Sequence, residues 1–146
     1  MILDSQLSLS RAQSIAAAAG DVVSTDYYDT GAAADVGIGE DFAIQVQLAA
    51  AVTSGGAATV QVVLQCDDNT SFSSAKEYPL TSALALASLT ANRILYQGRL
   101  PYGLERYIRV VYRIGTATTT AGTVNTFLAK DLQVAPILPT TVPGVK

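Results

Sequence analysis

Residues 106–115 read RYIRVVYRIG, and large apolar side chains alternate along them with arginine and tyrosine. After Arg106 the even positions are apolar or aromatic, whereas the odd positions carry Tyr107, Arg109, Val111 and Arg113. A period of two is typical of a β-strand that buries one face in a core and exposes the other. The segment therefore predicts a strand with a row of guanidinium groups on its outer side.

The same alternation recurs on both sides of this strand. Apolar residues occupy the even positions of residues 42–48 and again of 60–66, with a Gly-Gly turn between the two runs. This arrangement predicts a β-hairpin with one buried face. Residues 106–115 and the return run 123–130, joined by a loop of small residues, predict a second hairpin. The even phase also places Cys66 in the core, as a small apolar residue rather than a nucleophile.

Shorter runs complete the expected sheet. Residues 22–28, 83–86 and 94–97 read as further strands, and Asn92 suits the left-handed backbone of a turn. For residues 10–20 the sequence leaves open whether the segment forms a helix. Ser10 and Gln13 would form a helical capping box there, but the stretch is apolar all round and a helix would need cover.

About eight short strands separated by frequent turns, with no convincing long helix, predict an all-β fold. The simplest architecture is a single-domain β-sandwich of the jelly-roll type with extended termini. Residues 1–133 would form this domain, including an N-terminal arm, and the proline-rich residues 134–146 would form an extended C-terminal tail.

The composition excludes several classes of function. The 146 residues contain no histidine and one cysteine, which removes the commonest general base and any multi-cysteine metal site. A net charge of −3 has the wrong sign for an electrostatic nucleic-acid binder. No apolar run approaches the ~18 residues that span a bilayer. The first residues also lack the pattern of a secretory signal, so we expect synthesis in a cytoplasm.

The net charge hides a division along the chain. Residues 1–92 hold ten acids and two bases, a net of −8, whereas residues 93–146 hold seven bases and two acids, a net of +5. One interpretation is that the two halves interleave in space and the asymmetry disappears. The other is a surface with two signs of charge that docks on itself or on a large partner.

The sequence contains no recognisable catalytic, cofactor-binding or metal-binding motif. Asp67 and Asp68 open the polar loop CDDNTSFSS, where the turn chemistry of Asp, Asn and Ser is favoured over a calcium site. GIGED at residues 37–41 lacks the third glycine of a dinucleotide-binding loop. Tyrosines and arginines between residues 96 and 113 would suit stacking on bases or sugars, but packing in a core or an interface is favoured.

Four segments, taken in order, carry a resemblance to a known family. They are MILDSQLSLSRAQ (1–13), LQCDDNTSFSS (64–74), LASLTAN (86–92) and LPYGLERYIRVVYRIGTATTTAG (100–122). Their succession resembles the small capsid cement, or decoration, proteins of tailed bacteriophages, which have a jelly-roll fold. A member of that family more often has glycine where this chain has Asn92, and the tail after Gln133 has no counterpart.

The resemblance implies a virion protein that is not an enzyme. Such a protein binds the outside of the expanded icosahedral capsid and bridges neighbouring subunits of the major capsid protein. It implies no direct contact with nucleic acid or membrane. Self-association is expected as well, with a homodimer favoured and a homotrimer open.

The expected working surface combines the arginine strand with the N-terminal arm. Its candidate residues are Arg106, Tyr107, Arg109, Arg113, Ile2, Leu3 and Leu7. Arginine and tyrosine are enriched in interfaces, and guanidinium groups suit the carboxylates of an acidic partner. Two alternatives stay open: these arginines are only a solvated strand face, or the chain is a virion-borne carbohydrate-binding module for host attachment.

Overall fold

The computed structural model describes residues 5–31 and 42–130, and these residues form an all-β sandwich. The 3₁₀-helix η1 covers Ser5–Leu7 and η2 covers Leu86–Ser88. The strands are β1 Ser8–Ser14, β2 Gly20–Val23, β3 Tyr28–Asp29, β4 Phe42–Ser54, β5 Thr59–Asp67, β6 Lys76–Pro79, β7 Leu84–Ala85, β8 Ile94–Arg99, β9 Tyr107–Gly115 and β10 Thr119–Lys130. The predicted fold class is confirmed.

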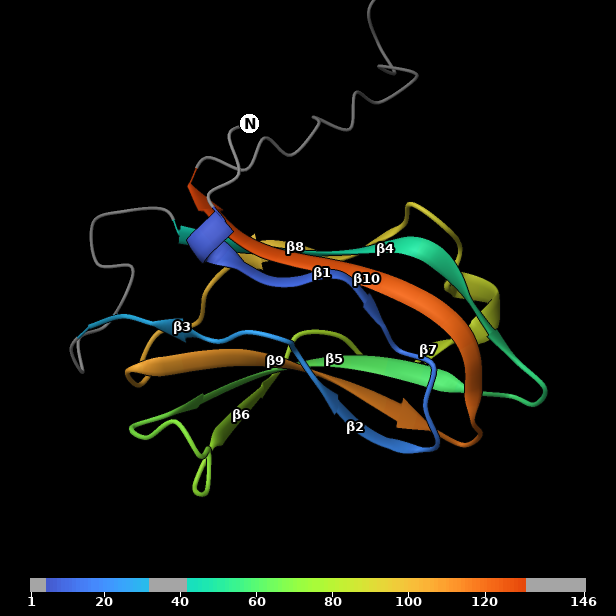
Figure 1. Ribbon diagram of the computed structural model, residues 1–146, viewed down its shortest axis with the longest axis horizontal. Helices are drawn as coiled ribbons and strands as arrows, with labels where there is room; N and C mark the ends of the chain where they lie inside the picture. Colours follow the sequence, from blue (N-terminus) through green and yellow to red (C-terminus); the bar gives the residue numbers. More distant parts are fainter. Residues whose placement is uncertain (1–4, 32–41, 131–146) are drawn as a thin grey trace, which may run out of the picture.

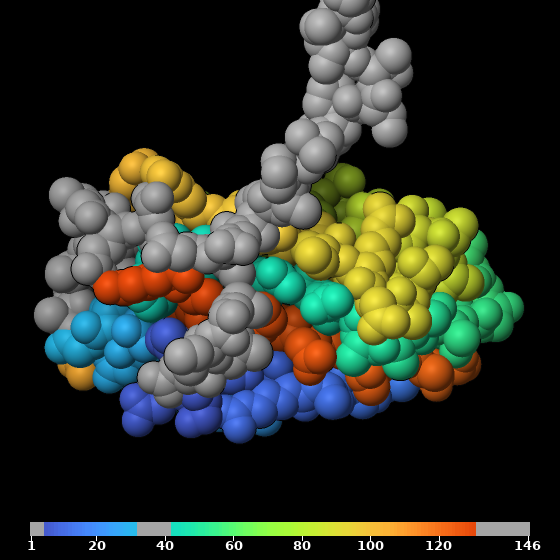
Figure 2. All heavy atoms as spheres, turned by 90° about the horizontal axis from the view of Figure 1, so that it is seen from above, coloured from blue at the N-terminus to red at the C-terminus, as the bar shows by residue number. Residues whose placement is uncertain are grey.

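Two antiparallel sheets lie one above the other (Figure 1). The first sheet has the order β1-β10-β4-β8, and Figure 2 shows its strands side by side from above. The second sheet has the order β2-β9-β5-β6, with the two-residue strands β3 on β9 and β7 on β5. Eight main strands divided between two sheets in this order fit a jelly roll.

Both predicted hairpins are wrong, although their strands exist. β4 and β5 are consecutive in the chain but belong to different sheets, and so do β9 and β10. β5 pairs instead with β9, and β4 pairs with β10, over long antiparallel registers. The alternation of apolar and polar residues shows which face of a strand is buried, but not which strand it pairs with. Two consecutive strands show the same alternation whether they form a hairpin within one sheet or an arch that crosses between the two sheets.

Residues 10–20 are not helical in the structure. β1 pairs with β10 over Ser8–Ser14, and its register shifts between Ser10 and Gln13. The side chains of the expected capping box do meet, since the Ser10 hydroxyl donates to Gln13 Oε1 at 2.7 Å, but they do so within this irregular strand. Ala12 lies in the irregular part with a φ of 44°. Pairing with β10 therefore overrides the local preference for a helix.

The shorter strands are confirmed in part. Residues 22–28 split into the end of β2 and the start of β3, whereas β7 and β8 lie close to their predicted positions. Asn92 has a φ of 62°, as expected of a left-handed turn residue. No helix among the described residues is long and apolar enough to cross a membrane.

The core lies between the sheets and consists of their inward-facing residues. On β9 these are Ile108, Val110, Tyr112 and Ile114, all at most 2% exposed, as the even phase predicted. Cys66 is fully buried on β5, and burial raises the pKa of its thiol. A buried thiol with a raised pKa is inert, so Cys66 is a core residue, as expected.

One polar connection crosses this apolar core. The Tyr112 hydroxyl lies 2.8 Å from Ser10 Oγ and 2.6 Å from Thr126 Oγ1. Tyr112 belongs to the second sheet, whereas Ser10 and Thr126 belong to neighbouring strands of the first. All three side chains are at most 2% exposed, so this hydroxyl triad joins the two sheets inside the core.

Candidate interaction surface

The outer face of the second sheet carries the predicted row of arginines. In β9, Arg109 and Arg113 pair in register with Gln65 and Gln61 of β5, and their neighbours along β9 point into the core. Val111 lies between the two arginines on this outer face, yet it is only 1% exposed. The aliphatic stems of long charged side chains cover apolar surface in this way.

Arg113 is held between carboxylates from both edges of the sheet. Its Nε and Nη2 donate to the two oxygens of Asp21 on β2, at 2.8 and 3.0 Å. Nη2 also donates to Glu77 Oε1 on β6 at 2.9 Å. These hydrogen bonds lower the pKa of Asp21, and together with one from Gln65 they lower the pKa of Glu77. Both acids in turn raise the pKa of Arg113.

Replacing Arg113 by glutamine is expected to raise the pKa of both Asp21 and Glu77 toward their ordinary values. In the wild type their lowered pKa values mean that the ion pairs stabilise the fold at neutral pH and lose this effect as pH falls through the folded values. The pairs are more than a third exposed, so the loss of stability at neutral pH should stay under about 1 kcal/mol. NMR titration of the side-chain carboxyl carbons measures both shifts.

Arg93→Gln is the matched control, because Arg93 donates to the Ser88 carbonyl and forms no ion pair with another described residue. Its substitution should leave the pKa of Asp21 and Glu77 unchanged. Equal titration curves for Arg113→Gln and the wild type would contradict the ion-pair assignment.

Arg106 also forms an ion pair with a carboxylate of the same chain. Its Nε and Nη2 donate to the two oxygens of Asp29 at 2.8 and 3.0 Å. The guanidinium lowers the pKa of Asp29, and the Gly31 amide, which donates to Oδ1 at 2.8 Å, lowers it further. Acids from the first part of the chain thus pair with bases from the second. Across these contacts the two halves interleave, which was one of the two interpretations of the charge division.

Arg109 makes no such ion pair among the described residues. Its Nε donates to Gln65 Oε1 at 2.8 Å, and its guanidinium carbon lies 4.0 Å from the centre of the Phe72 ring. Burial lowers the pKa of Arg109, which is the expected effect of removing water from a cation. Gln65 also donates to Glu77 at 2.8 Å, so hydrogen bonds run without a break from Asp21 to Arg109.

Phe72 reaches Arg109 because the loop between β5 and β6 is folded tightly around Asp67. This carboxylate is buried and accepts hydrogen bonds from the backbone amides of Asp68 and Ser74, at 2.7 and 2.9 Å. Burial raises the pKa of Asp67, but these and further hydrogen bonds outweigh that effect and lower it overall. The loop uses Asp67 as an anchor for a turn, which supports the turn interpretation over a calcium site.

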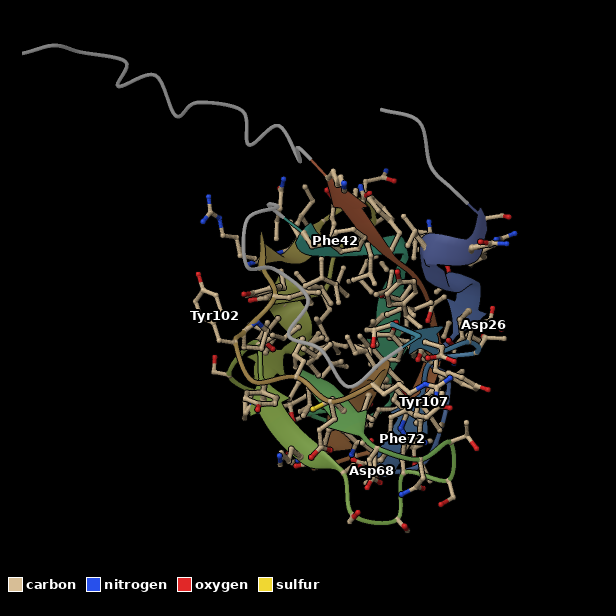
Figure 3. The ribbon with its side chains drawn as sticks, turned by 90° about the vertical axis from the view of Figure 1, so that its left-hand side faces the viewer. Asp26, Phe42, Asp68, Phe72, Tyr102 and Tyr107 are labelled. Carbon is tan, nitrogen blue, oxygen red and sulfur yellow. The ribbon has the colours of Figure 1, made fainter. Side chains whose placement is uncertain are left out.

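Three aromatic rings gather at this end of the second sheet. Tyr27 meets Tyr107 and Phe72 edge to face, with ring centres 5.7 and 6.2 Å apart, and Arg106 lies 5.0 Å above the Tyr107 ring. Figure 3 shows Phe72 and Tyr107 close together, with Asp68 beside them. Tyr27 is 48% exposed, whereas Phe72 is 8% exposed and has a φ of 51°. A phenylalanine in the left-handed region is a strained feature that tends to mark functional sites.

We call Tyr27, Phe72, Arg106, Tyr107 and Arg109 the aromatic-arginine cluster. Arg106, Tyr107 and Arg109 were predicted as surface residues from the sequence, whereas Tyr27 and Phe72 were not. Tyr27 lies in the connection between β2 and β3, which breaks the single strand predicted over residues 22–28, and Phe72 lies in a polar loop without a strand period. The one available signal was a phenylalanine in the otherwise polar stretch 67–74.

Of the predicted N-terminal arm residues, the structure describes Leu7, which does not lie on this surface. Leu7 is half-buried in η1 and packs against the core beside β1 of the first sheet, whereas the arginines lie outside the second sheet. Ile2 and Leu3 lie outside the described residues, as do residues 37–41 and the tail 134–146. Within the described part of the chain, no three cysteine or acidic side chains are grouped so that they could hold a metal ion.

A match to a protein family covers most of the chain. Residues 9–128 match the model of the Bbp16 family, and this span runs from the second residue of β1 to Leu128, two residues before the end of β10. The chain belongs to the Bbp16 family. Bbp16 is a phage-related family, and its matched span includes every strand of both sheets and the whole aromatic-arginine cluster. No curated protein matches the chain.

Proposed function

We propose that this Bbp16-family chain is a structural, non-enzymatic protein of a tailed-phage virion. In this proposal it binds the outside of the expanded icosahedral capsid and bridges neighbouring subunits of the major capsid protein, so that the shell withstands internal pressure. It is made in the host cytoplasm and associates with itself, as a dimer in the favoured case. The match of residues 9–128 to a phage-related family and the resemblance to capsid cement proteins support this role.

The aromatic-arginine cluster is the observation that carries the proposed contact. Tyrosine and arginine are the residues that most often dominate binding energy at interfaces. Here they are already ordered by ion pairs, ring contacts and the anchored loop, so docking would cost little further side-chain entropy. Modest contacts of this kind, repeated by the symmetry of a shell, become strong through high effective concentration.

The ion pairs change the kind of contact that we expect. Arg106 and Arg113 are matched by carboxylates of the same chain, so they do not offer unpaired charge to an acidic partner. Reversing the charge of Arg113 would place a third acid beside Asp21 and Glu77 and disturb the surface itself. The rings of Tyr27, which is exposed, and of Tyr107, which is half-buried, are therefore the better positions at which to test binding.

We expect the double variant Tyr27→Ala/Tyr107→Ala to bind emptied, expanded phage heads about thirtyfold more weakly, since interface aromatics often contribute about 1 kcal/mol or more each. Co-sedimentation of purified protein with such heads measures this loss. Tyr102→Ala is the matched control, because Tyr102 is 70% exposed but lies at a different edge of the molecule (Figure 3).

The binding experiment tests the contact surface and the capsid role separately. Wild-type affinity in the double variant would remove the cluster as the contact. Failure of the wild type to bind expanded heads would overturn the capsid role. A specific signal on a glycan array would favour the carbohydrate-binding alternative, although the edge-to-face rings do not form the flat platform on which sugars stack.

A further inference from the structure

A cleft opens at the side of the sandwich, away from the aromatic-arginine cluster. It lies between β6, at the edge of the second sheet, and β8, at the edge of the first. Its volume is about 420 Å³, and it is lined by residues 77–80, Tyr96, Arg99 and Pro101. Figure 3 shows Tyr102, the neighbour of Pro101, on this open side.

The lining combines tyrosine and proline rings from both sheets. Tyr78 and Pro79 come from β6, Tyr96 comes from β8, and Pro101 follows β8. Grooves of this composition bind peptides in the polyproline II conformation, because flat aromatic rings pack against proline rings. Tyrosine hydroxyls beside them donate to the peptide carbonyls, which have no internal partners in that conformation.

The Tyr96 hydroxyl is suited to such a bond. It has no hydrogen-bond partner among the described residues, and its ring lies across Gly98. A Cβ atom at position 98 would stand 2.7 Å from this hydroxyl oxygen. The absence of a side chain at Gly98 therefore lets the phenol lie flat along β8.

The chain itself contains a ligand of the matching type. Residues 136–139 read PILP, a Pro-x-x-Pro sequence. With three residues per turn and a rise of about 3.1 Å per residue, the two prolines would share one side, roughly 9 Å apart.

The same end of the first sheet holds both the start of this tail and the mouth of the cleft. Lys130, the last residue of β10, pairs with Phe42, and the Phe42 carbonyl accepts a hydrogen bond from the Leu100 amide at 3.1 Å. Two strand spacings, about 10 Å, thus separate Lys130 from the segment that leads into Pro101. The six Cα–Cα steps from Lys130 to Pro136 span up to about 20 Å, which is long enough to reach the cleft.

We propose that the cleft between β6 and β8 binds residues 136–139 of the same chain as a polyproline II segment. The two proline rings pack on Tyr78 and Tyr96, and the Tyr96 hydroxyl donates to a carbonyl of the segment. Docking there also covers the open edges of both sheets, which otherwise invite pairing with other chains. This proposal is independent of the capsid role.

A spin label tests the proposal in the full-length protein. Thr140→Cys places one reactive thiol just after the motif, because buried Cys66 does not react. The nitroxide should broaden the amide signals of Glu77, Tyr78, Leu80 and residues 96–99 and leave those of β2 unaffected. Broadening that is uniform, or that falls on another surface, would overturn the proposal.

Two substitutions should abolish this broadening. Pro136→Ala/Pro139→Ala removes both rings of the segment, and Gly98→Ala displaces the Tyr96 phenol at the far end of a flexible side chain, so the fold should persist. Pro143→Ala is the control and should retain the effect. Unchanged signals from β5 and β9 show that each variant is folded.

Mixing separates docking within a chain from docking between copies. Spin-labelled protein without isotopes is added to isotope-labelled protein without a spin label. The proposal expects no selective broadening in this mixture. Broadening of the cleft signals in the mixture, at the strength seen within one chain, would contradict docking in the same chain.

Discussion

Replacing Tyr112 by phenylalanine is expected to lower the free energy of unfolding by about 2 kcal/mol. The substitution keeps the ring, so the packing of the core is retained, but it removes the hydroxyl that joins Ser10 and Thr126. Thr126 is fully buried and would lose the partner of its hydroxyl. A buried polar group without a partner costs roughly 1–3 kcal/mol. Urea unfolding at neutral pH measures the difference.

The same tyrosine predicts a loss of stability in alkali. Burial raises the pKa of Tyr112 to about 12, although hydrogen bonds from Ser10 and Thr126 partly oppose this effect. A raised pKa in the folded state means that the contribution is fully present below the unfolded value near 10 and is lost as pH rises toward the folded value. The loss should approach about 1.4 kcal/mol per pH unit between these values.

Tyr107→Phe provides the matched control on the same strand. Its hydroxyl lies on the outer face and has no hydrogen-bond partner among the described residues, so the change should be nearly neutral. Tyr112→Phe should also show a shallower alkaline decline than the wild type, because it lacks the titrating group. Equal stability of the two variants would mean that the triad does not hold the sheets together.

Replacing Gly122 by alanine is the second substitution with a large expected effect, about 3 kcal/mol. Gly122 lies in β10 with a φ of 141°, where a residue with a side chain is strained. An added Cβ would also stand 2.9 Å from Val52 Cγ2, 3.2 Å from Val52 Cα and 3.3 Å from Ile15 Cγ1. Part of this crowding comes from backbone, so it cannot be relieved by rotating a side chain.

Gly20→Ala is the control that separates the cost of backbone strain from the cost of crowding. Gly20 has a similar φ of 147°, but a Cβ added there meets no atom within 4 Å. We expect this control to cost only the backbone strain, roughly 1–2 kcal/mol, and Gly122→Ala to cost clearly more. Thermal or urea unfolding of both variants measures the two losses of stability. If the two costs agree, the crowding against Val52 and Ile15 is relieved by local movement.

The sequence was most informative where one strand could be judged alone. The period of two in residues 42–48, 60–66 and 106–115 identified the buried faces, and the structure confirms them. The period did not identify which strands pair, because residues alternate between the two faces of a strand both in a hairpin and in an arch between sheets. Both predicted hairpins therefore failed, whereas the number of main strands and the sandwich were right.

On the candidate surface, too, the sequence predicted which way residues face but not what they contact. Period and charge identified Arg109 and Arg113 as outward-facing, but an outward arginine is either free or paired, and sequence does not distinguish the two. Asp21 and Glu77 stand 92 and 36 residues from Arg113 along the chain and reach it only across the folded sheet.

The residues alone were therefore enough to predict the all-β class, the core face of each long strand, the buried Cys66 and the turn at Asn92. These follow from local sterics and from the preference of apolar side chains for a dry face. The folded chain was needed to show which strands pair, that Arg106 and Arg113 are matched by acids, and that Tyr27, Phe72 and Tyr107 meet. Those contacts join residues distant in sequence, and their geometry is set by how two sheets stack rather than by any segment alone.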